Sequence, residues 1–366
     1  MANFMDYLEW RGDLTFAQSP FNDIDAMILS SLSYVNFDGI VPGIGGTYKT
    51  VKEASDEFFT LYTKEQLKKD KSFTRNMPYL MQKAAETKRF GNARLQNYET
   101  HLSETEESQF AAIEIITDDD VAFISFRGTD DTIVGWKEDF NMSYKPIPSQ
   151  KYAIDYINKV MFQPHCLRIG GHSKGGHLAV YGATFTEKRN QRWIETIYAL
   201  DSPGFTPAFI TDERYQAIKD RIIRMIPEES IIGLLLDHDI EPVVIKCSGK
   251  GVMAHDTWTW QVMTTSPVEA KAITSAAGVF DEVFKKWVAQ VEPDQRKVFV
   301  DDVFSLFEVT GLKTLTDLQN EGIHHVREIF ERFNRLDKGT REVVELLFKV
   351  LWSQWWESLS SLFKVK

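Results

Sequence analysis

Cysteine is scarce in this sequence: the 366 residues include two, Cys166 and Cys247. Two cysteines cannot build a disulfide framework, and because both lie in apolar, strand-like runs we expect buried free thiols in a reducing compartment. No apolar run approaches the ~18 residues that a membrane span needs. The first ten residues lack the basic start and apolar stretch of a secretion signal. We therefore expect a cytoplasmic protein.

Motifs for metals, cofactors and phosphates are also missing. The patterns CxxC, HExxH and GxxxxGK[ST] do not occur, so no metal and no cofactor is expected. A net charge of -11 argues against a nucleic-acid partner, because binding a phosphate backbone requires clustered positive charge. Hydrophobic residues at 43% and charged residues at 26% are typical of a globular protein, and the length favours two folded units.

The organising stretch is 167–179, which has the pattern of a strand, a sharp turn and a helix. At its centre, Gly171-x-Ser173-x-Gly175 matches a nucleophile elbow, a strained turn that lifts a serine hydroxyl above the edge of a sheet. The helix that follows directs its first N–H groups, beginning with that of Lys174, at a developing oxyanion. The sequence therefore predicts Ser173 as a nucleophile.

Strand and helix patterns alternate around this elbow. Apolar runs at 110–117 and 121–127, separated by three aspartates, predict a hairpin. After the elbow, three further strands are predicted at 194–200, 222–226 and 242–247. Helical patterns cover 20–36 and the polar stretch 50–100. The alternation predicts an α/β fold of the α/β-hydrolase kind, with a mostly parallel sheet and helices on both faces.

After residue 265 the strand patterns end. Helical periodicity covers 268–291, 296–310, 316–336 and 340–363. We therefore predict an α/β-hydrolase domain over 1–265, with a helical region at about 50–105, and a C-terminal helical region over 266–366. The last predicted helix is apolar around most of its circumference, which favours burial within its own domain or in a homodimer. Contact with a membrane surface is the alternative, although its polar face carries little basic charge.

Several segments resemble α/β-hydrolase lipases, above all the class 3 (fungal-type) lipases. The run Ile169–Ala179 resembles their elbow, with the departure that Lys174 stands where they usually have an apolar residue. The turn Phe126–Asp130 resembles their Arg-Gly-Ser/Thr turn, which implies that the N–H and hydroxyl of Thr129 belong to an oxyanion hole. Over its full length the chain resembles a poorly characterised bacterial family of lipase-like α/β-hydrolases, through the segments Trp10–Phe16 and Asp201–Phe205.

The same resemblance selects a histidine. His255 follows the last predicted strand, where α/β-hydrolases place their catalytic histidine, and tryptophans follow it closely, as aromatic residues do in class 3 lipases. His238 is the competing candidate. An imidazole in this position would remove the serine proton, provided that an acid holds its tautomer.

The acid is the least determined member of the triad. In class 3 lipases it follows the next-to-last core strand, but the corresponding position here is Ser230. Pancreatic-type lipases place it one strand earlier, in a context that Asp201 matches. Asp201 is therefore our prediction, and Glu229 and Asp239 are the alternatives. The order Ser173, Asp201, His255 is the order that α/β-hydrolases use.

Two functions are compatible with these residues. The first is a serine esterase or lipase-like enzyme that cleaves an acyl ester through an acyl-enzyme. The second is a non-catalytic binding or scaffolding protein on the same fold, which the serine at the usual acid position favours. The leaving group, whether alcohol, thiol or amine, is not determined by these residues.

Overall fold

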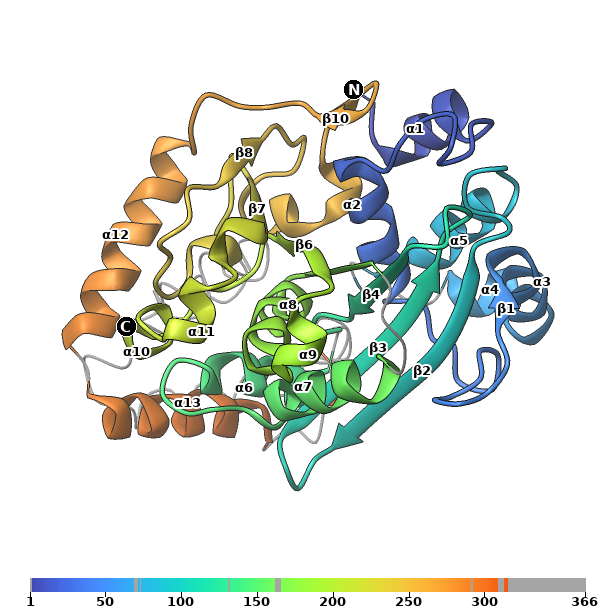
Figure 1. The fold of residues 1–366 in the computed structure, drawn as a ribbon. Coiled ribbons are helices and arrows are strands. Elements are labelled where there is room, and N and C mark those ends of the chain that lie inside the picture. Colours follow the sequence, from blue (N-terminus) through green and yellow to red (C-terminus); the bar gives the residue numbers. More distant parts are fainter. Residues whose placement is uncertain are drawn as a thin grey trace.

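A computed structural model describes residues 2–68, 72, 74–130, 132–161, 166–290, 292–308 and 313–314. An eight-stranded sheet runs through the molecule, with its strands side by side in sequence order (Figure 1). The strands are β1 (Lys49–Thr50), β2 (Arg94–Ser103), β3 (Ser108–Ile116), β4 (Ala122–Phe126), β5 (Leu167–His172), β6 (Ile194–Leu200), β7 (Ile222–Pro227) and β8 (Val243–Ile245).

The sheet joins an antiparallel part to a parallel part. β1 to β4 pair antiparallel, and β3 with β4 forms the predicted hairpin, in which Ile116 lies opposite Ala122. β4 to β8 pair in parallel. The predicted α/β class with a mostly parallel sheet is confirmed. Because parallel strands end at one edge, the loops after β4 to β8 all lie together at that edge.

Helices cover both faces of the sheet. They are α1 (Phe4–Arg11), α2 (Asp23–Leu32), α3 (Val51–Leu61), α4 (Lys64–Leu67), α5 (Met77–Ala85), α6 (Ile133–Asn141), α7 (Pro148–Val160), α8 (Lys174–Phe185), α9 (Lys188–Gln191), α10 (Pro207–Ile210) and α11 (Glu213–Gln216). One apolar cluster joins α1, α2, α3 and α5 to the face that carries Phe123. The other joins α7 and α8 to the face that carries Ile124. Neighbours along a strand point to opposite faces, so β4 contributes to both clusters.

Short elements and two longer helices follow the parallel strands. They are η1 (Lys219–Arg221), η2 (Ile232–Leu234), η3 (Gly251–His255), η4 (Thr257–Thr259), β9 (Val262–Met263), β10 (Ser266–Pro267), α12 (Ser275–Gln290) and α13 (Pro293–Glu308). α13 packs against α6, with the rings of Phe140 and Phe304 5.7 Å apart. None of the helices in the described residues has both the length and the apolar character needed to cross a bilayer.

The helices predicted at 316–336 and 340–363 lie outside the described residues. Both interpretations of the last helix, and the division of the chain at residue 265, therefore stay predictions.

Two expectations about local structure are wrong. Residues 94–100 do not continue a helical region but belong to β2, which pairs along its length with β3. Leu95 and Tyr98 are buried while most of their neighbours are partly exposed and polar. The sequence therefore lacks the clear alternation of apolar and polar residues that would predict a strand here. Cys166 is an exposed thiol at the start of β5, whereas Cys247 is buried as expected, and both are free.

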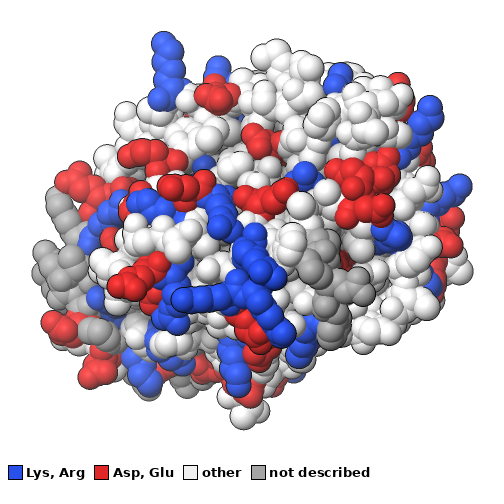
Figure 2. Space-filling model, viewed as in Figure 1, with Lys and Arg blue, Asp and Glu red and all other residues white. Residues whose placement is uncertain are grey.

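Acidic and basic side chains are mixed over the surface seen in Figure 2. A short run of basic side chains near the centre of this face is bordered by acidic ones. Neither sign of charge dominates this face.

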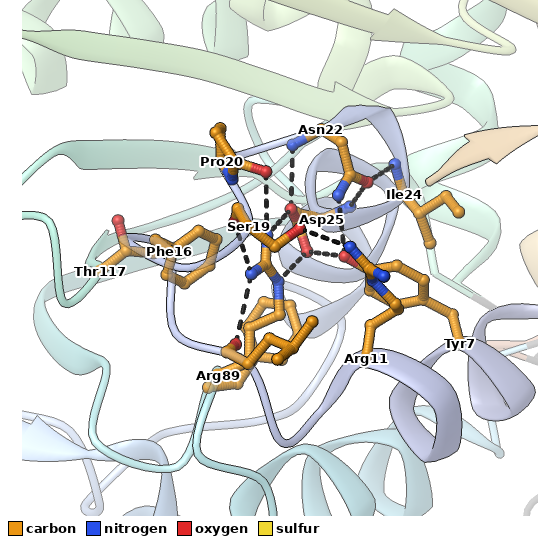
Figure 3. A network of polar contacts seen from close by, with 12 residues as sticks. Tyr7, Arg11, Phe16, Ser19, Pro20, Asn22, Ile24, Asp25, Arg89 and Thr117 are labelled. Atoms are coloured by element: carbon orange, nitrogen blue, oxygen red, sulfur yellow. Dashed lines mark hydrogen bonds and ion pairs between the residues drawn. The ribbon is translucent and has the colours of Figure 1, made fainter. Parts of the chain in front are cut away.

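The N-terminal segment folds around a buried ion pair between Arg89 and Asp25 (Figure 3). Both side chains are fully buried. The Arg89 Nε donates to Asp25 Oδ1 at 2.7 Å, Nη1 donates to the carbonyl of Ser19 at 2.9 Å, and the guanidinium lies 3.9 Å from the centre of the Phe16 ring. Tyr7 donates its hydroxyl to the same carboxylate at 2.8 Å. The Trp10–Phe16 motif therefore ends on the ion pair, and its role here is structural.

We expect Arg89→Met to lower the free energy of unfolding by about 3–5 kcal/mol, because it leaves the Asp25 carboxylate buried without its cation. Urea denaturation followed by circular dichroism measures the loss. Lys83→Met is the control, since it breaks a partly exposed pair with Glu9 at 3.6 Å and should change stability by less than about 1 kcal/mol. Equal losses in the two variants would contradict a structural role specific to Arg89.

Candidate active site

Ser173 occupies a strained turn between β5 and α8. Its backbone has φ 60° and ψ -134°, a conformation that a residue with a side chain adopts at a cost of about 1–3 kcal/mol. Its N–H still donates to the carbonyl of Leu200 at 2.9 Å, so the serine leaves the sheet directly at its edge. This is the strand-turn-helix geometry expected of a nucleophile elbow.

Glycines make this turn possible. A Cβ added at Gly175 would lie 2.1 Å from the Phe126 carbonyl oxygen, and one added at Gly171 would lie 2.3 Å from the Gly175 carbonyl carbon. A Cβ at Gly128 would lie 3.0 Å from the Cβ of Ser173. The elbow and the loop after β4 therefore touch through their backbones, and only glycine fits at these contacts.

Asp201 and His255 form a hydrogen-bonded pair at the same edge. Asp201 follows β6 with φ 42°, and His255 ends η3, after β8. Nδ1 of His255 and Oδ2 of Asp201 are 2.6 Å apart, and both residues are buried. Because an ionised carboxylate only accepts, Nδ1 of His255 carries the proton, which leaves the lone pair of the neutral ring on Nε2. This is the tautomer that a general base for a serine requires.

Ser230, the residue that the resemblance to class 3 lipases places at the position of the acid, contacts Asp201. Its hydroxyl donates a short hydrogen bond to Asp201 Oδ1, which also accepts the N–H of Gly233 at 3.1 Å. With Oδ2 bonded to His255, both oxygens of the carboxylate have partners. In the sequence, Ser230 favoured the interpretation that the acid had been lost. In the structure, it holds the Asp201 carboxylate in place.

His172 lies behind His255, with the two ring centres 4.3 Å apart. Its Nε2–H donates to the His255 carbonyl at 2.8 Å, and its Nδ1 accepts the Tyr34 hydroxyl at 2.9 Å. Burial, followed by the neighbouring His255, lowers the pKa of His172 well below its usual value, so it stays neutral. Among the described residues, ligand atoms of His172, Asp201 and His255 lie within 4.8 Å of one another, a spacing that would suit a metal ion. Since both His172 nitrogens have protein partners, hydrogen bonding alone accounts for the grouping.

Thr129 follows β4 and is tied to α6. Its hydroxyl lies 2.8 and 2.7 Å from the two carboxylate oxygens of Asp139 and donates to them. A hydroxyl has one proton, so this hydroxyl does not serve an oxyanion while Asp139 is ionised. Burial raises the pKa of Asp139 to about 6, against the lowering effects of the Lys174 ammonium and the Thr129 hydroxyl. Of the two Thr129 donors predicted for an oxyanion, the N–H and the hydroxyl, the hydroxyl is thus engaged with Asp139, and the N–H stays the candidate.

The other candidates lie elsewhere. The Asp239 carboxylate accepts hydrogen bonds from Tyr215 and from Lys219, the latter at 3.0 Å. His238 is buried near Arg224, and burial followed by that positive charge lowers its pKa well below the usual value. Of the three proposed acids, Asp201 is the one whose carboxylate bonds to the predicted histidine.

A cavity of about 290 Å³ lies beside α8, beginning one helical turn beyond Ser173. Its walls include His177, Tyr181, Phe205 and Phe209. His177 is held there by hydrogen bonds to the Gly204 carbonyl and to Gln150, and burial lowers its pKa to about 4. A neutral histidine bonded through both nitrogens acts as part of the cavity wall.

Sequence reasoning overlooked three contributors to this site. Tyr34 and Asp139 lie on elements whose link to the elbow appears only in three dimensions. Glu138, the partner of Lys174, was detectable in principle: a lysine inside an elbow that is otherwise apolar must be buried, and a buried lysine needs an acid.

Ser173, Asp201 and His255 all lie at the carboxyl edge of the parallel strands, which defines a lipase-like α/β protein with a serine, an acid and a histidine at one edge. A family model described as Mbeg1-like matches residues 84–305, and the chain belongs to this family. The crystal structure of M37 lipase is similar at 16% identity over 58% of this chain and 70% of that one, with a TM-score of 0.35. No curated protein matches the chain.

We expect Gly175→Ala to destabilise the protein by about 1–3 kcal/mol, because the new methyl group meets a backbone carbonyl that cannot rotate away. Gly278→Ala is the matched control: it also lies in a helix, and its nearest neighbour would be a side-chain carbon 3.9 Å away. That variant should be neutral or more stable by about 0.5–1 kcal/mol. Thermal melting of both proteins checks the prediction, and a Gly175→Ala protein as stable as the control would contradict the crowding.

Proposed function

We propose that this protein is a serine hydrolase of the esterase or lipase-like type, which cleaves an acyl ester through an acyl-enzyme. The observation that carries the proposal is the Asp201–His255 hydrogen bond of 2.6 Å at the sheet edge where the strained Ser173 turn ends β5. Each residue alone has an ordinary structural explanation. Their positions after β5, β6 and β8, at one edge of the parallel strands, are what a nucleophile, acid and base need.

In the proposed acylation step, Ser173 Oγ attacks the carbonyl carbon of the ester, and its proton passes to Nε2 of His255. The carbonyl oxygen becomes an oxyanion that accepts the N–H groups of Lys174 and Thr129. When the tetrahedral intermediate collapses, the bond to the alcohol breaks and His255 returns the proton to the leaving oxygen. The acyl group then remains on Ser173.

Deacylation uses the same groups with water as the nucleophile. The water oxygen attacks the acyl carbon while His255 takes a proton from the water. His255 then gives this proton to Ser173 Oγ as the carboxylic acid product leaves. Throughout, Asp201 accepts the Nδ1–H of His255, which maintains the tautomer and stabilises the imidazolium. Ser230 and the N–H of Gly233 keep that carboxylate oriented.

The substrate class in this proposal is a small-molecule or lipid acyl ester, with no cofactor and no nucleic-acid partner. The likeness to class 3 lipases and the cytoplasmic location belong to the proposal too. So does association through the C-terminal residues, as a homodimer or at a membrane surface. A scaffolding protein on the same fold is the second candidate. The hydrogen bond from Ser230 to Asp201 argues against the scaffold, because Ser230 then supports an acid at Asp201 and does not mark the loss of one.

We expect Ser173→Ala to abolish hydrolysis of short-chain nitrophenyl esters, with a loss of at least about 10³-fold in kcat/KM. Labelling by a fluorophosphonate probe should disappear with it, because the probe bonds to the activated oxygen. Ser248→Ala, which changes an exposed serine, is the control and should keep both activities. Folded wild-type protein that neither hydrolyses nor labels would support the scaffold instead.

We expect Asp201→Asn to lower kcat by about 10⁴-fold, since an amide at this position would favour the wrong His255 tautomer. Asp239→Asn removes the charge of an alternative acid and should leave kcat within a few fold of wild type. Initial rates with the same ester compare the two. A large loss with Asp239→Asn or with Glu229→Gln, together with normal turnover in Asp201→Asn, would move the acid to a later strand.

A further inference from the structure

Lys174 is a fully buried lysine that directly follows the proposed nucleophile. Its ammonium donates to the Gln109 carbonyl at 2.9 Å and to Glu138 Oε2 at 2.7 Å, and lies 3.8 Å from Asp139 Oδ1. An apolar residue would pack at the start of a buried helix without the desolvation that a charge incurs. The presence of a lysine therefore needs an explanation beyond packing.

Glu138 anchors this ammonium to the rest of the fold. Oε2 also accepts the N–H of Gln109 at 3.0 Å, while Oε1 accepts the N–H and hydroxyl of Ser149 at 3.2 and 2.6 Å. The carboxylate is thus bonded to β3 and to the start of α7. The residue next to it on α6 is Asp139, so the same anchoring fixes where α6 presents Asp139 to Thr129.

The cluster contains one cation for two carboxylates. Glu138 is satisfied by three donors besides the ammonium, whereas Asp139 is held by the Thr129 hydroxyl and by the nearby Lys174 charge. Thr129 begins the turn that would bind the oxyanion. A chain of contacts therefore runs from the elbow lysine, through Asp139, to the other side of the proposed oxyanion hole.

We propose that the Lys174 side chain is a positioning residue, which keeps Asp139 ionised so that its carboxylate holds Thr129 in place at the oxyanion hole. Lys174 acts on the reaction twice in this arrangement, through its backbone N–H directly and through its ammonium by way of Asp139. This role rests on the proposed hydrolase function, and it explains why a buried lysine, rather than an apolar residue, follows Ser173.

The direction of the pH effect follows from the charges around Asp139. The groups that act on it include Lys174 from α8, Glu138 on α6, His255 from η3, the Thr129 hydroxyl and the hydroxyl of Tyr34, which follows α2. Burial sets its pKa to about 6, and Lys174 exerts the largest opposing effect. Above that pKa both carboxylate oxygens accept the Thr129 hydroxyl, and below it the protonated acid accepts more weakly, through its carbonyl oxygen, while its own O–H becomes a competing donor. Removing the ammonium raises the pKa, so the loop would be set correctly only at higher pH.

The test compares pH profiles of kcat for a short-chain nitrophenyl ester in wild type, Lys174→Met and Lys174→Met/Glu138→Gln. The double variant removes the unpaired Glu138 charge and keeps an acceptor for Ser149, so we expect it to lose less stability than the single variant. Lys174 affects Asp139 more than Glu138 does, so the double variant still shifts in the same direction. We expect the acid limb of kcat to move to higher pH by at least about one unit, which lowers kcat at pH 7 by about twofold or more, with recovery near pH 9 and KM within about threefold.

Lys137→Met is the matched control, because Lys137 lies on α6 and pairs with Glu107 at 2.8 Å. It removes the same charge from the same region and should leave the acid limb unchanged. In an Asp139→Asn background, Lys174→Met should no longer move the acid limb, because residue 139 then has no carboxyl group to titrate.

A folded double variant with the wild-type pH profile would overturn the proposal. So would a loss of kcat that is uniform across pH, which is what a purely structural role predicts. If wild type itself neither labels with a fluorophosphonate nor turns over, the hydrolase function has failed, and that outcome is distinct from either result.

Discussion

The site depends on one close backbone contact, between the start of α8 and the end of β4. The first turn of α8 lies against the end of β4, with no room for a Cβ at Gly175, and the loop after β4 lies against Ser173 through Gly128. This approach brings the turn that carries Thr129 beside the serine, although the two lie on different strands. Ser173 has its left-handed conformation at this same contact, so the strain at the proposed nucleophile and the position of the proposed oxyanion donor both depend on one region of close packing.

Two buried ion pairs stabilise the regions on either side of this contact, and they differ in what they anchor. Arg89 binds Asp25 and the carbonyls of the N-terminal segment, which it attaches to α2 and the sheet. Lys174 binds Glu138 and the Gln109 carbonyl, which joins the elbow to α6 and β3. A lone buried charge is strongly destabilising, so each pair requires its extra hydrogen bonds. Of the two pairs, the Lys174–Glu138 pair is the one beside residues proposed to touch a substrate, since Lys174 directly follows Ser173.

Local patterns were sufficient to predict the parallel strands and the strand-turn-helix segment around Ser173, because each depends on short apolar runs and on glycines at fixed spacing. Asp201 and His255 were selected by the resemblance to lipases, and their roles stay predictions. β2 was missed because its exposed side is polar and its pairing with β3, not its own residues, makes it a strand. The exposure of Cys166 depends on what surrounds the start of β5 and could not be read from its neighbours in sequence. The contacts of Tyr34 and Asp139 join segments that meet only after folding, so no spacing rule reveals them.

The position of the proposed acid, Asp201, depends on the packing of two neighbouring strands. β6 and β7 are adjacent and parallel, so residues after either strand reach the same place beside His255. A carboxylate after both strands would set two negative charges side by side and raise the pKa of one of them. With Asp201 after β6, the residue after β7 must instead donate a hydrogen bond, and a serine does so with a short side chain. Ser230 is therefore the complement of an acid at Asp201, and its hydroxyl accounts for the absence of a second carboxylate there.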